Sequence, residues 1–398
     1  MRTSLPGILF LILMAGGAAS ASEPYSSLEA GYMDGFYLKT PDNKFLLKVG
    51  SRLNFGYTAG FPGSQPNFSS FDLYHAKIYA GGNVYTPSLQ FYVQAAGATQ
   101  TRGPSLSPAP ESANGSFTLE DYYIRFLRPE WNVQFGQFKV PYAREWITYS
   151  GNLNFVDRSL ATRFFTLGRD RGIALNSDRN TFAISMGVFN GGGNPILGTG
   201  FQPNSLNTNG ENVSNDVSGR GFAHLVVVRA VASPMGPAGY SEGDVENSEM
   251  PKFDFGAGFT YDRNRDVALG GALVATRADI WSASADAVFK SAGTAVQSEF
   301  FYRRVNTPGA VTSMGFYVQP SVFIHSNKLE LAARFGWLEP DTNVTNDTNY
   351  EAAAAWNLYL FGDHREKTQL QYTWRRQEAS PAGHADDSFI DLAFQFTI

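Results

Sequence analysis

Apolar and polar residues alternate in strand-length runs along most of this chain. From Phe253 to Tyr261, aromatic rings and an alanine take every second position, and aspartate, glycine and threonine fill the others. The run from Gln369 to Arg375 repeats the scheme with Leu370, Tyr372 and Trp374. Because successive side chains of a strand point to opposite faces, this pattern predicts β-strands with one apolar and one polar face. About sixteen such runs lie between residues 45 and 398, so we predict an all-β fold.

Two all-β classes remain open at this point, a membrane barrel and a secreted, soluble ligand-binding β protein. Aromatic residues make up 14% of the chain, with 32 Phe and 19 Tyr, yet the mean hydropathy is only -0.22. Rings interleaved with polar residues fit the alternating strands and aromatic girdles of an outer-membrane barrel. A soluble β-sandwich would share part of this composition, because its apolar faces form a packed core. A helical membrane protein is excluded, since no segment approaches about 20 uninterrupted apolar residues.

The connections between the runs favour the barrel. Tight turns alternate with long segments rich in glycine, asparagine, serine and proline, as in barrels with short turns at one rim and long loops at the other. The long segments are predicted at 100–115, 140–168, 191–218, 263–277, 338–349 and 378–387. Pro234 to Pro251 breaks the rule, because it is long and acidic where a short turn is expected. Gly35 to Lys44 resembles a hairpin, so eighteen strands remain an alternative to sixteen.

The N-terminus predicts export. Residues 1–21 combine Arg2, the apolar run from Ile8 to Met14 and the small residues Ala19 to Ala21, as in a secretory signal peptide. We therefore expect a signal peptide at 1–21, a periplasmic segment or hairpin at 22–44 and a barrel domain at 45–398. The chain has no cysteine, which excludes disulfides and thiolate metal sites, and its net charge of -5 gives no indication of nucleic-acid binding.

One stretch, from Gln134 to Gly172, departs from the alternating pattern. It begins as a strand, but the period-2 pattern disappears after Pro141 for more than twenty residues, and so long an irregular segment is usually functional. Acidic residues there are Glu145, Asp157 and Asp170. Basic residues outnumber them: Lys139, Arg144, Arg158, Arg163, Arg169 and Arg171.

Three motifs in this stretch resemble the phosphate-selective porin O and P family. They are Gly136-Gln137-Phe138-Lys139-Val140-Pro141, Asp157-Arg158-Ser159-Leu160 and Gly168-Arg169-Asp170-Arg171-Gly172. The chain differs from the family pattern at Tyr142-Ala143 and at Leu167. The resemblance implies a homotrimer of sixteen-stranded barrels in the bacterial outer membrane, whose third loop, here 140–168, folds into the lumen and narrows it. It also implies phosphate or chloride as solutes.

The candidate site follows from field focusing in a narrow, water-filled pore, where fixed positive charges concentrate anions. We assign Lys139, Arg144, Arg158, Arg163, Arg169 and Arg171 to an anion-interacting constriction, with Lys48, Arg52, Lys77 and Arg125 as basic residues on the lumen face of the strands. The family motif residues are Gly136, Gln137, Phe138, Lys139 and Pro141. The alternative is that the arginines pair with Glu145, Asp157 and Asp170 and only fix the loop to the wall. Acids and bases balance on the polar faces of the strands, so any anion preference is expected to be modest.

Catalysis finds little support in the sequence. The five histidines are scattered over different runs, and neither a Gly-x-Ser-x-Gly elbow nor a phosphate-binding glycine loop occurs. We therefore expect no enzyme activity, no cofactor and no metal. The chain is expected to be an outer-membrane porin, in contact with membrane lipid, through which small hydrophilic solutes diffuse passively with a lean towards anions. A secreted ligand-binding β protein, or a barrel that serves as an adhesin or enzyme, remains the alternative.

Overall fold

The computed structural model describes residues 28–63, 66–97, 118–191, 224–269, 272–306, 310–325, 327–379 and 383–398. The predicted signal peptide at 1–21, the predicted loop at 100–115 and nearly all of the one at 191–218 lie outside these residues.

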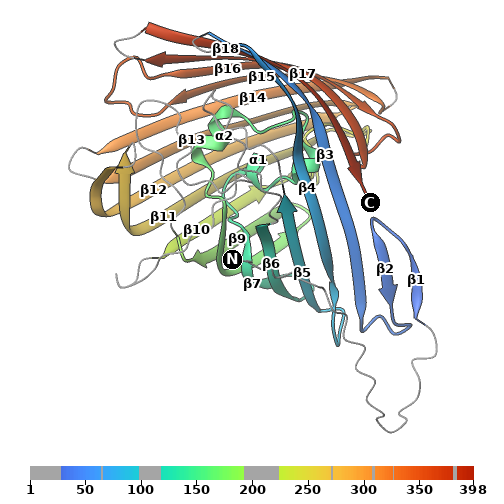
Figure 1. Ribbon diagram of the computed structural model, residues 1–398. Helices are drawn as coiled ribbons and strands as arrows, with labels where there is room; N and C mark the ends of the chain where they lie inside the picture. The colour runs from blue at the N-terminus through green and yellow to red at the C-terminus, as the bar shows by residue number, and fades with distance from the viewer. Residues whose placement is uncertain are drawn as a thin grey trace, which may run out of the picture.

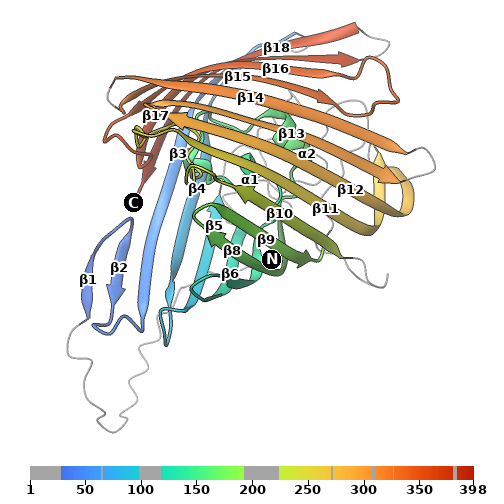
Figure 2. The ribbon, with the colours of Figure 1, turned by 180° about the vertical axis from the view of Figure 1, so that it is seen from behind.

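The strands form a closed antiparallel barrel (Figures 1 and 2). Each strand from β3 onward pairs with the next along the chain, and β18 returns to pair with β3, so that Phe394 lies opposite Phe55. The prediction of sixteen barrel strands is thereby confirmed. The strands of the ring are β3 (Leu46–Pro62), β4 (Phe68–Asn83), β5 (Leu89–Gly97), β6 (Thr118–Leu127), β7 (Asn132–Lys139), β8 (Arg169–Arg179), β9 (Phe182–Phe189), β10 (Leu225–Ala232), β11 (Lys252–Leu269), β12 (Ala272–Ser291), β13 (Thr294–Asn306), β14 (Val311–His325), β15 (Leu329–Glu339), β16 (Asn349–Tyr359), β17 (Glu366–Ala379) and β18 (Gly383–Thr397).

Two further strands precede the ring and explain the ambiguity between sixteen and eighteen. A hairpin of β1 (Glu29–Tyr32) and β2 (Phe36–Lys39) turns at Asp34 and Gly35, both of which have positive φ. Strand β2 pairs with the first residues of β3, from Leu46 to Val49, while β18 pairs with β3 only from Arg52 onward. The hairpin therefore extends the sheet beyond the end of β18, beside the C-terminus (Figure 1).

The two rims differ, as the sequence predicts. We call the end at which β3 begins and β18 finishes the C-terminal rim, and the other end the loop rim. The predicted loop at 378–387 is wrong, however, because β17 and β18 pair as far as Ala379 and Gly383. The predicted loop at 263–277 is also wrong, because β11 and β12 run through it and pair as far as Leu269 and Ala272. Register shifts between Asp262 and Ala268 interrupt the period-2 pattern of β11, so the sequence of this part does not predict a strand.

The barrel is apolar outside and polar inside. Outward positions carry exposed rings such as Phe55, Phe255 and Trp356, while inward positions carry fully buried Arg52 and Glu351. A soluble sandwich would place the apolar faces of the strands in its core, so this arrangement excludes that alternative. An apolar outer surface is what a barrel surrounded by lipid requires. Among the described residues, no helix is both long and apolar enough to span a membrane.

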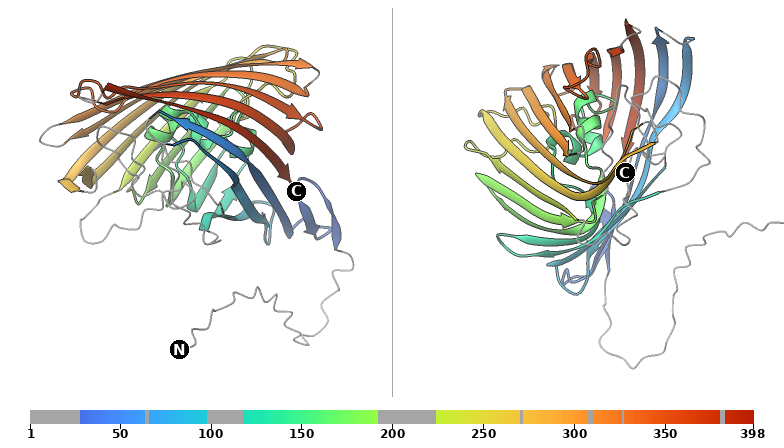
Figure 3. Two further views of the ribbon diagram at one scale, coloured as in Figure 1. Left: turned by 45° about the horizontal axis from the view of Figure 1, so that its top comes forward. Right: turned by 90° about the vertical axis from the view of Figure 1, so that its left-hand side faces the viewer.

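Residues 140–168, between β7 and β8, form a compact helical segment that we call the inner segment. It contains α1 (Arg144–Ile147), a 3-10 turn (Ser150–Asn152) and α2 (Leu160–Phe165), whose first turn is capped by the Ser159 hydroxyl. The strands curve around this segment (Figure 3). Its apolar side chains pack with inward residues of β13, β14 and β15, namely Phe301, Tyr317 and Leu338.

Candidate functional site

The inner segment is attached to inward side chains from strands around much of the barrel. Glu299 on β13 accepts hydrogen bonds from the backbone N–H groups of Arg144 (2.7 Å) and Glu145 (3.2 Å), at the start of α1. Gln371 on β17 accepts one from the Val156 N–H at 2.8 Å. Asn357 on β16 donates to the Asn154 carbonyl at 2.9 Å. The polar wall therefore satisfies the irregular backbone of the segment, which would otherwise lack partners.

Arg144 is buried and faces the wall. Its guanidinium pairs with Asp254 on β11 at 3.2 Å, lies over the ring of Tyr240 at 4.8 Å and donates to the carbonyl of Gly239. A fourth contact reaches Gln297 at 3.4 Å. These contacts attach the segment to the wall and to residues 239–240.

Lys139 and Arg158 both hold the carbonyl end of α1. The Lys139 ammonium donates to the carbonyls of Trp146 and Thr148, each at 2.8 Å. The Arg158 guanidinium donates to the same two carbonyls at 3.3 and 3.0 Å and lies over the Trp146 ring at 4.7 Å. The last carbonyls of a helix have no partners within it and carry partial negative charge, so two cations there stabilise its end.

Of the remaining basic residues of the stretch, two form ion pairs and one lies on the outer surface of the barrel. Arg163 pairs with Asp157 within the segment. Arg169 pairs with Asp121 at 3.0 Å and, at 3.4 Å, with Glu120. Arg171 is exposed and, by alternation, shares the outer face of β8 with Ile173 and Leu175. The outer face does not border the lumen, so the exposure of Arg171 there does not agree with its predicted place at the constriction.

The basic residues on the strands occupy different surroundings. Lys77 is buried in an ion pair with Glu120 at 2.6 Å. Arg52 is fully buried, donates to the Ser150 hydroxyl at 2.7 Å and lies over the Tyr149 ring at 4.7 Å. Lys48 and Arg125 are both half-exposed. Arg125 donates to Gln134 at 2.6 and 3.0 Å. Among the contacts of the described residues, neither Lys48 nor Arg125 forms a buried ion pair of the kind that Lys77 forms with Glu120.

The family motif is a strand end that approaches its neighbours closely. Gly136 has a φ of 138°, and a Cβ there would lie 2.2 Å from the Tyr122 carbonyl, so only glycine fits. Gln137 donates to the backbone carbonyls of Leu119 and Glu120 at 3.1 and 2.7 Å. Phe138 packs edge-on against Tyr123 and Phe189, and Pro141 follows the last strand residue, Lys139, at the point where the chain turns inward.

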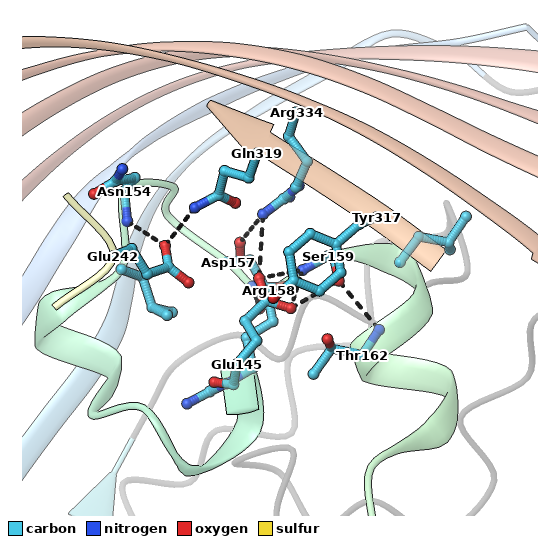
Figure 4. Close-up of polar contacts among 12 residues, drawn as sticks. Glu145, Asn154, Asp157, Arg158, Ser159, Thr162, Glu242, Tyr317, Gln319 and Arg334 are labelled. Atoms are coloured by element: carbon cyan, nitrogen blue, oxygen red, sulfur yellow. Dashed lines mark hydrogen bonds and ion pairs between the residues drawn. The ribbon is translucent and has the colours of Figure 1, made fainter. Parts of the chain in front are cut away.

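A second inward element was missed by the sequence reasoning. Residues 233–251, which connect β10 to β11 at the C-terminal rim, fold back inside the barrel, and we call them the inner turn. Glu242 accepts from the Asn154 N–H at 2.7 Å and from Gln319 on β14 at 2.8 Å, and its own N–H donates to the Asn152 carbonyl at 3.2 Å (Figure 4). The sequence signal for this element is the length and acidity of Pro234 to Pro251, where a short turn is expected.

The junction of the two inward elements contains a buried carboxyl pair. Glu145 is fully buried and accepts from the Ser159 N–H (3.0 and 3.1 Å) and hydroxyl (2.7 Å), and Arg334 on β15 lies 3.6 Å away (Figure 4). Burial, followed by the neighbouring Glu242 carboxylate, raises the pKa of Glu145 to about 7. Burial also raises the pKa of Glu242. Folding therefore favours the protonated form of Glu145.

This shift predicts a pH dependence of stability. The folded pKa lies above the unfolded one, so the contribution of Glu145 is complete below its ordinary pKa of 4.5 and is lost as the pH rises through about 7. We expect the temperature at which the folded band disappears on a gel to fall between pH 5 and pH 8 more in the wild type than in Glu145→Gln, which cannot ionise. Parallel curves for the two proteins would contradict the assignment.

Comparison with known proteins agrees with this architecture. The model of the family "Phosphate-selective porin O and P" matches residues 47–398. Similar folds include an anion-selective porin from Comamonas acidovorans (TM-score 0.61, 9% identity, 88% of this chain and 99% of that one) and the outer membrane channel DcaP of Acinetobacter baumannii (0.58, 11%, 92% and 99%). The trimer form of OmpT from Vibrio cholerae is also similar (0.51, 10%, 88% and 99%). No curated protein sequence was found to match this chain.

Identities this low show the shared fold only, but the family match covers most of the chain and spans the whole ring of strands. The family and the fold point to a channel rather than to an enzyme. The chain therefore belongs to the phosphate-selective porin O and P family, and is a porin of the bacterial outer membrane.

Proposed function

We propose that the protein is a passive diffusion channel for small hydrophilic solutes with a modest preference for anions such as chloride or phosphate. The observation that carries the preference is the half-exposed pair Lys48 and Arg125 on the inner face of β3 and β6, near the C-terminal rim. Water-filled surroundings with protein walls focus the field of such charges and raise the local anion concentration.

The charge balance near this pair explains why the preference is modest. Inward acids on the same wall, Asp72, Glu120 and Asp121, are buried towards the loop rim, and Asp178 is exposed at the end of β8. These carboxylates offset part of the positive potential that Lys48 and Arg125 create in the interior. The cations that contact the inner segment act differently. Lys139 at the end of β7, and Arg144, Arg158 and Arg163 within the segment, hold it in position, and they contribute to selectivity only through their long-range field.

We further propose export through the signal peptide at 1–21 and assembly as a homotrimer. The apolar outer surface supports contact with membrane lipid. The trimer is supported by the family resemblance and by the similarity to OmpT, whose trimer form has the same fold. Residues 22–44, which include the β1–β2 hairpin, would then lie on the periplasmic side.

The zero-current potential in a planar bilayer tests the proposal. Under a potassium chloride gradient, we expect a potential of the sign for anion preference, and Lys48→Gln with Arg125→Gln is expected to move it towards zero because it removes the two half-exposed cations. Added phosphate is expected to reduce the chloride current if it enters the same path.

Arg365→Gln serves as the matched control, since this arginine pairs with Asp363 in an exposed turn at the same rim. Its potential should equal that of the wild type. A cation-signed potential for the wild type would refute the anion preference, and an unchanged potential in the double variant would remove Lys48 and Arg125 as its source.

A further inference from the structure

The inner turn differs from the other connections at its rim. Neighbouring strands there are joined by short turns, such as Ala292–Gly293 between β12 and β13, whereas the inner turn runs from residue 233 to residue 251. An exposed loop of this length would be tolerated, but the middle of this segment is buried: Glu242 is 2% exposed and Asp244 is 1% exposed. Two of its acidic residues, Glu242 and Asp244, are therefore not part of a solvated insertion, whereas Glu246 and Glu249 are exposed.

Side chains fix the inner turn against one half of the barrel wall. Asp244 accepts from the Ser248 N–H (2.9 Å), the Ser248 hydroxyl (2.7 Å) and the Gly293 N–H (2.9 Å), which attaches the turn to the β12–β13 connection. Lys290 on β12 donates to the Ser241 carbonyl at 2.6 Å. The Ser241 hydroxyl also contacts His364, just before β17, at 2.7 Å. The turn thus extends from β11 across to β17.

The inner turn also meets the inner segment, which enters from the opposite rim. Arg144 donates to the Gly239 carbonyl and lies over Tyr240, while Glu242 binds the backbone of Asn152 and Asn154. A Cβ at Gly243 would lie 3.3 Å from the Asn154 side chain and 2.2 Å from Glu330 on β15, which shows how closely the two elements and the wall approach. Together they cross the barrel interior.

Exposure of the inward side chains divides the barrel into two halves at this level. On β12 to β17, beside the inner turn and residues 151–154 of the inner segment, inward residues are buried: Lys290, Gln297, Gln319, Glu330, Asn357, Lys367 and Gln369. On β3 to β8, inward residues near the same rim are half-exposed: Lys48, Tyr79, Gln90, Tyr92, Tyr123, Arg125, Asn132 and Asn176. Near this rim, solvent therefore reaches the interior beside β3 to β8, whereas further along these strands inward residues such as Arg52 and Lys77 are buried.

We propose that the inner turn 233–251 is a second constriction element, which together with residues 151–154 of the inner segment fills the β11 to β17 half of the lumen near the C-terminal rim and sets the largest solute that can pass beside β3 to β8 there. Glu242 and Arg144 join it to the inner segment, so the width of the path depends on both elements. The inference builds on the proposed channel function but does not depend on its anion preference, because a steric filter acts equally on uncharged solutes.

Liposome swelling with neutral sugars of increasing size tests the inference. In one variant, Asn-Gly replaces residues 235–252 and closes a two-residue hairpin, because Ala232 and Phe255 are already paired. In a second, Glu242→Ala removes only the contacts with Asn154 and Gln319. We expect both variants to admit a trisaccharide that the wild type excludes or slows, so that the swelling rates with the trisaccharide and with a monosaccharide become more alike. The deletion is expected to have the larger effect.

Glu246→Ala is the matched control, because Glu246 lies in the same turn but its side chain is 82% exposed. It should retain the size limit of the wild type. If the deletion variant, recovered as a heat-modifiable barrel, keeps that limit, the inference is wrong. If the deletion does not fold, an unchanged limit in Glu242→Ala would overturn it equally. Zero-current potentials of the same proteins report the anion preference separately, so failure of one proposal is distinguishable from failure of the other.

Discussion

Replacement of Arg334 by alanine is expected to destabilise the docked inner segment by about 3 to 5 kcal/mol, the range for removal of one partner from a buried ion pair. Arg334 donates to Glu351 at 2.8 Å and to the Asp157 carbonyl at 3.0 Å, and lies over the Phe155 ring at 4.3 Å. Its loss leaves Glu145 without this cation. The temperature at which the folded form is lost in detergent, and protease cleavage within 140–168, would measure the effect.

Arg376→Ala provides the control for this prediction. Arg376 also binds a carboxylate through two hydrogen bonds, to Asp386 at 2.8 and 2.9 Å, but both side chains are 38% exposed, so about 0 to 1 kcal/mol is expected. A double-mutant cycle with Glu351→Gln isolates the Arg334–Glu351 interaction. Equal effects of Arg334→Ala and Arg376→Ala would contradict a buried anchoring role.

The substitution Phe165→Ala is expected to have a comparable effect through packing. Phe165 is fully buried, stacks on Phe301 of β13 at 5.1 Å with an interplanar angle of 3°, and packs edge-on against Phe164 at 4.9 Å. Removal of a buried ring costs about 3 to 5 kcal/mol, because transfer free energy is lost and a cavity remains. We expect α2 to detach from the wall, with noisier single-channel currents and faster proteolysis of 140–168.

The control is Phe361→Ala, in the turn before β17, where the ring is 66% exposed. Such a surface substitution is expected to change stability by no more than about 0.5 kcal/mol. If Phe165→Ala and Phe361→Ala unfold at the same temperature and conduct with the same noise, α2 does not depend on this aromatic stack for its position.

The fold could be predicted well because each strand carries its own signal. Alternation in runs such as Phe253–Tyr261 identifies both the strand and its two faces, and only a closed ring satisfies every edge of such a sheet in lipid. The sequence could not identify which medium covers the apolar face, since a sandwich and a barrel share the pattern. The alternating pattern is also absent from the sequence between Asp262 and Ala268, where register shifts interrupt the pairing of β11 with β12.

The candidate site was predicted less well, because charge in the sequence does not reveal its partner. Lys139, Arg144 and Arg158 are basic and lie in the irregular stretch, as predicted, yet their closest contacts are carbonyls and carboxylates of the inner segment, the inner turn and the wall. The partners of Lys139 and Arg158 lie within the same stretch, but those of Arg144, Asp254 on β11 and Gly239 in the inner turn, are distant in sequence. No local pattern indicates that residues so far apart in sequence will meet.

The sequence by itself determined the strands, their apolar and polar faces and the place where the chain leaves the wall at Pro141, because these depend on local periodicity and backbone constraints. Only the tertiary structure decided that the acidic segment 233–251 turns inward to meet Asn154, and that Lys48 and Arg125 stay half-exposed while Arg144 is buried. The reason is physical: closure of the ring brings distant strands around one interior, and the exposure of each charge depends on what else fills that space.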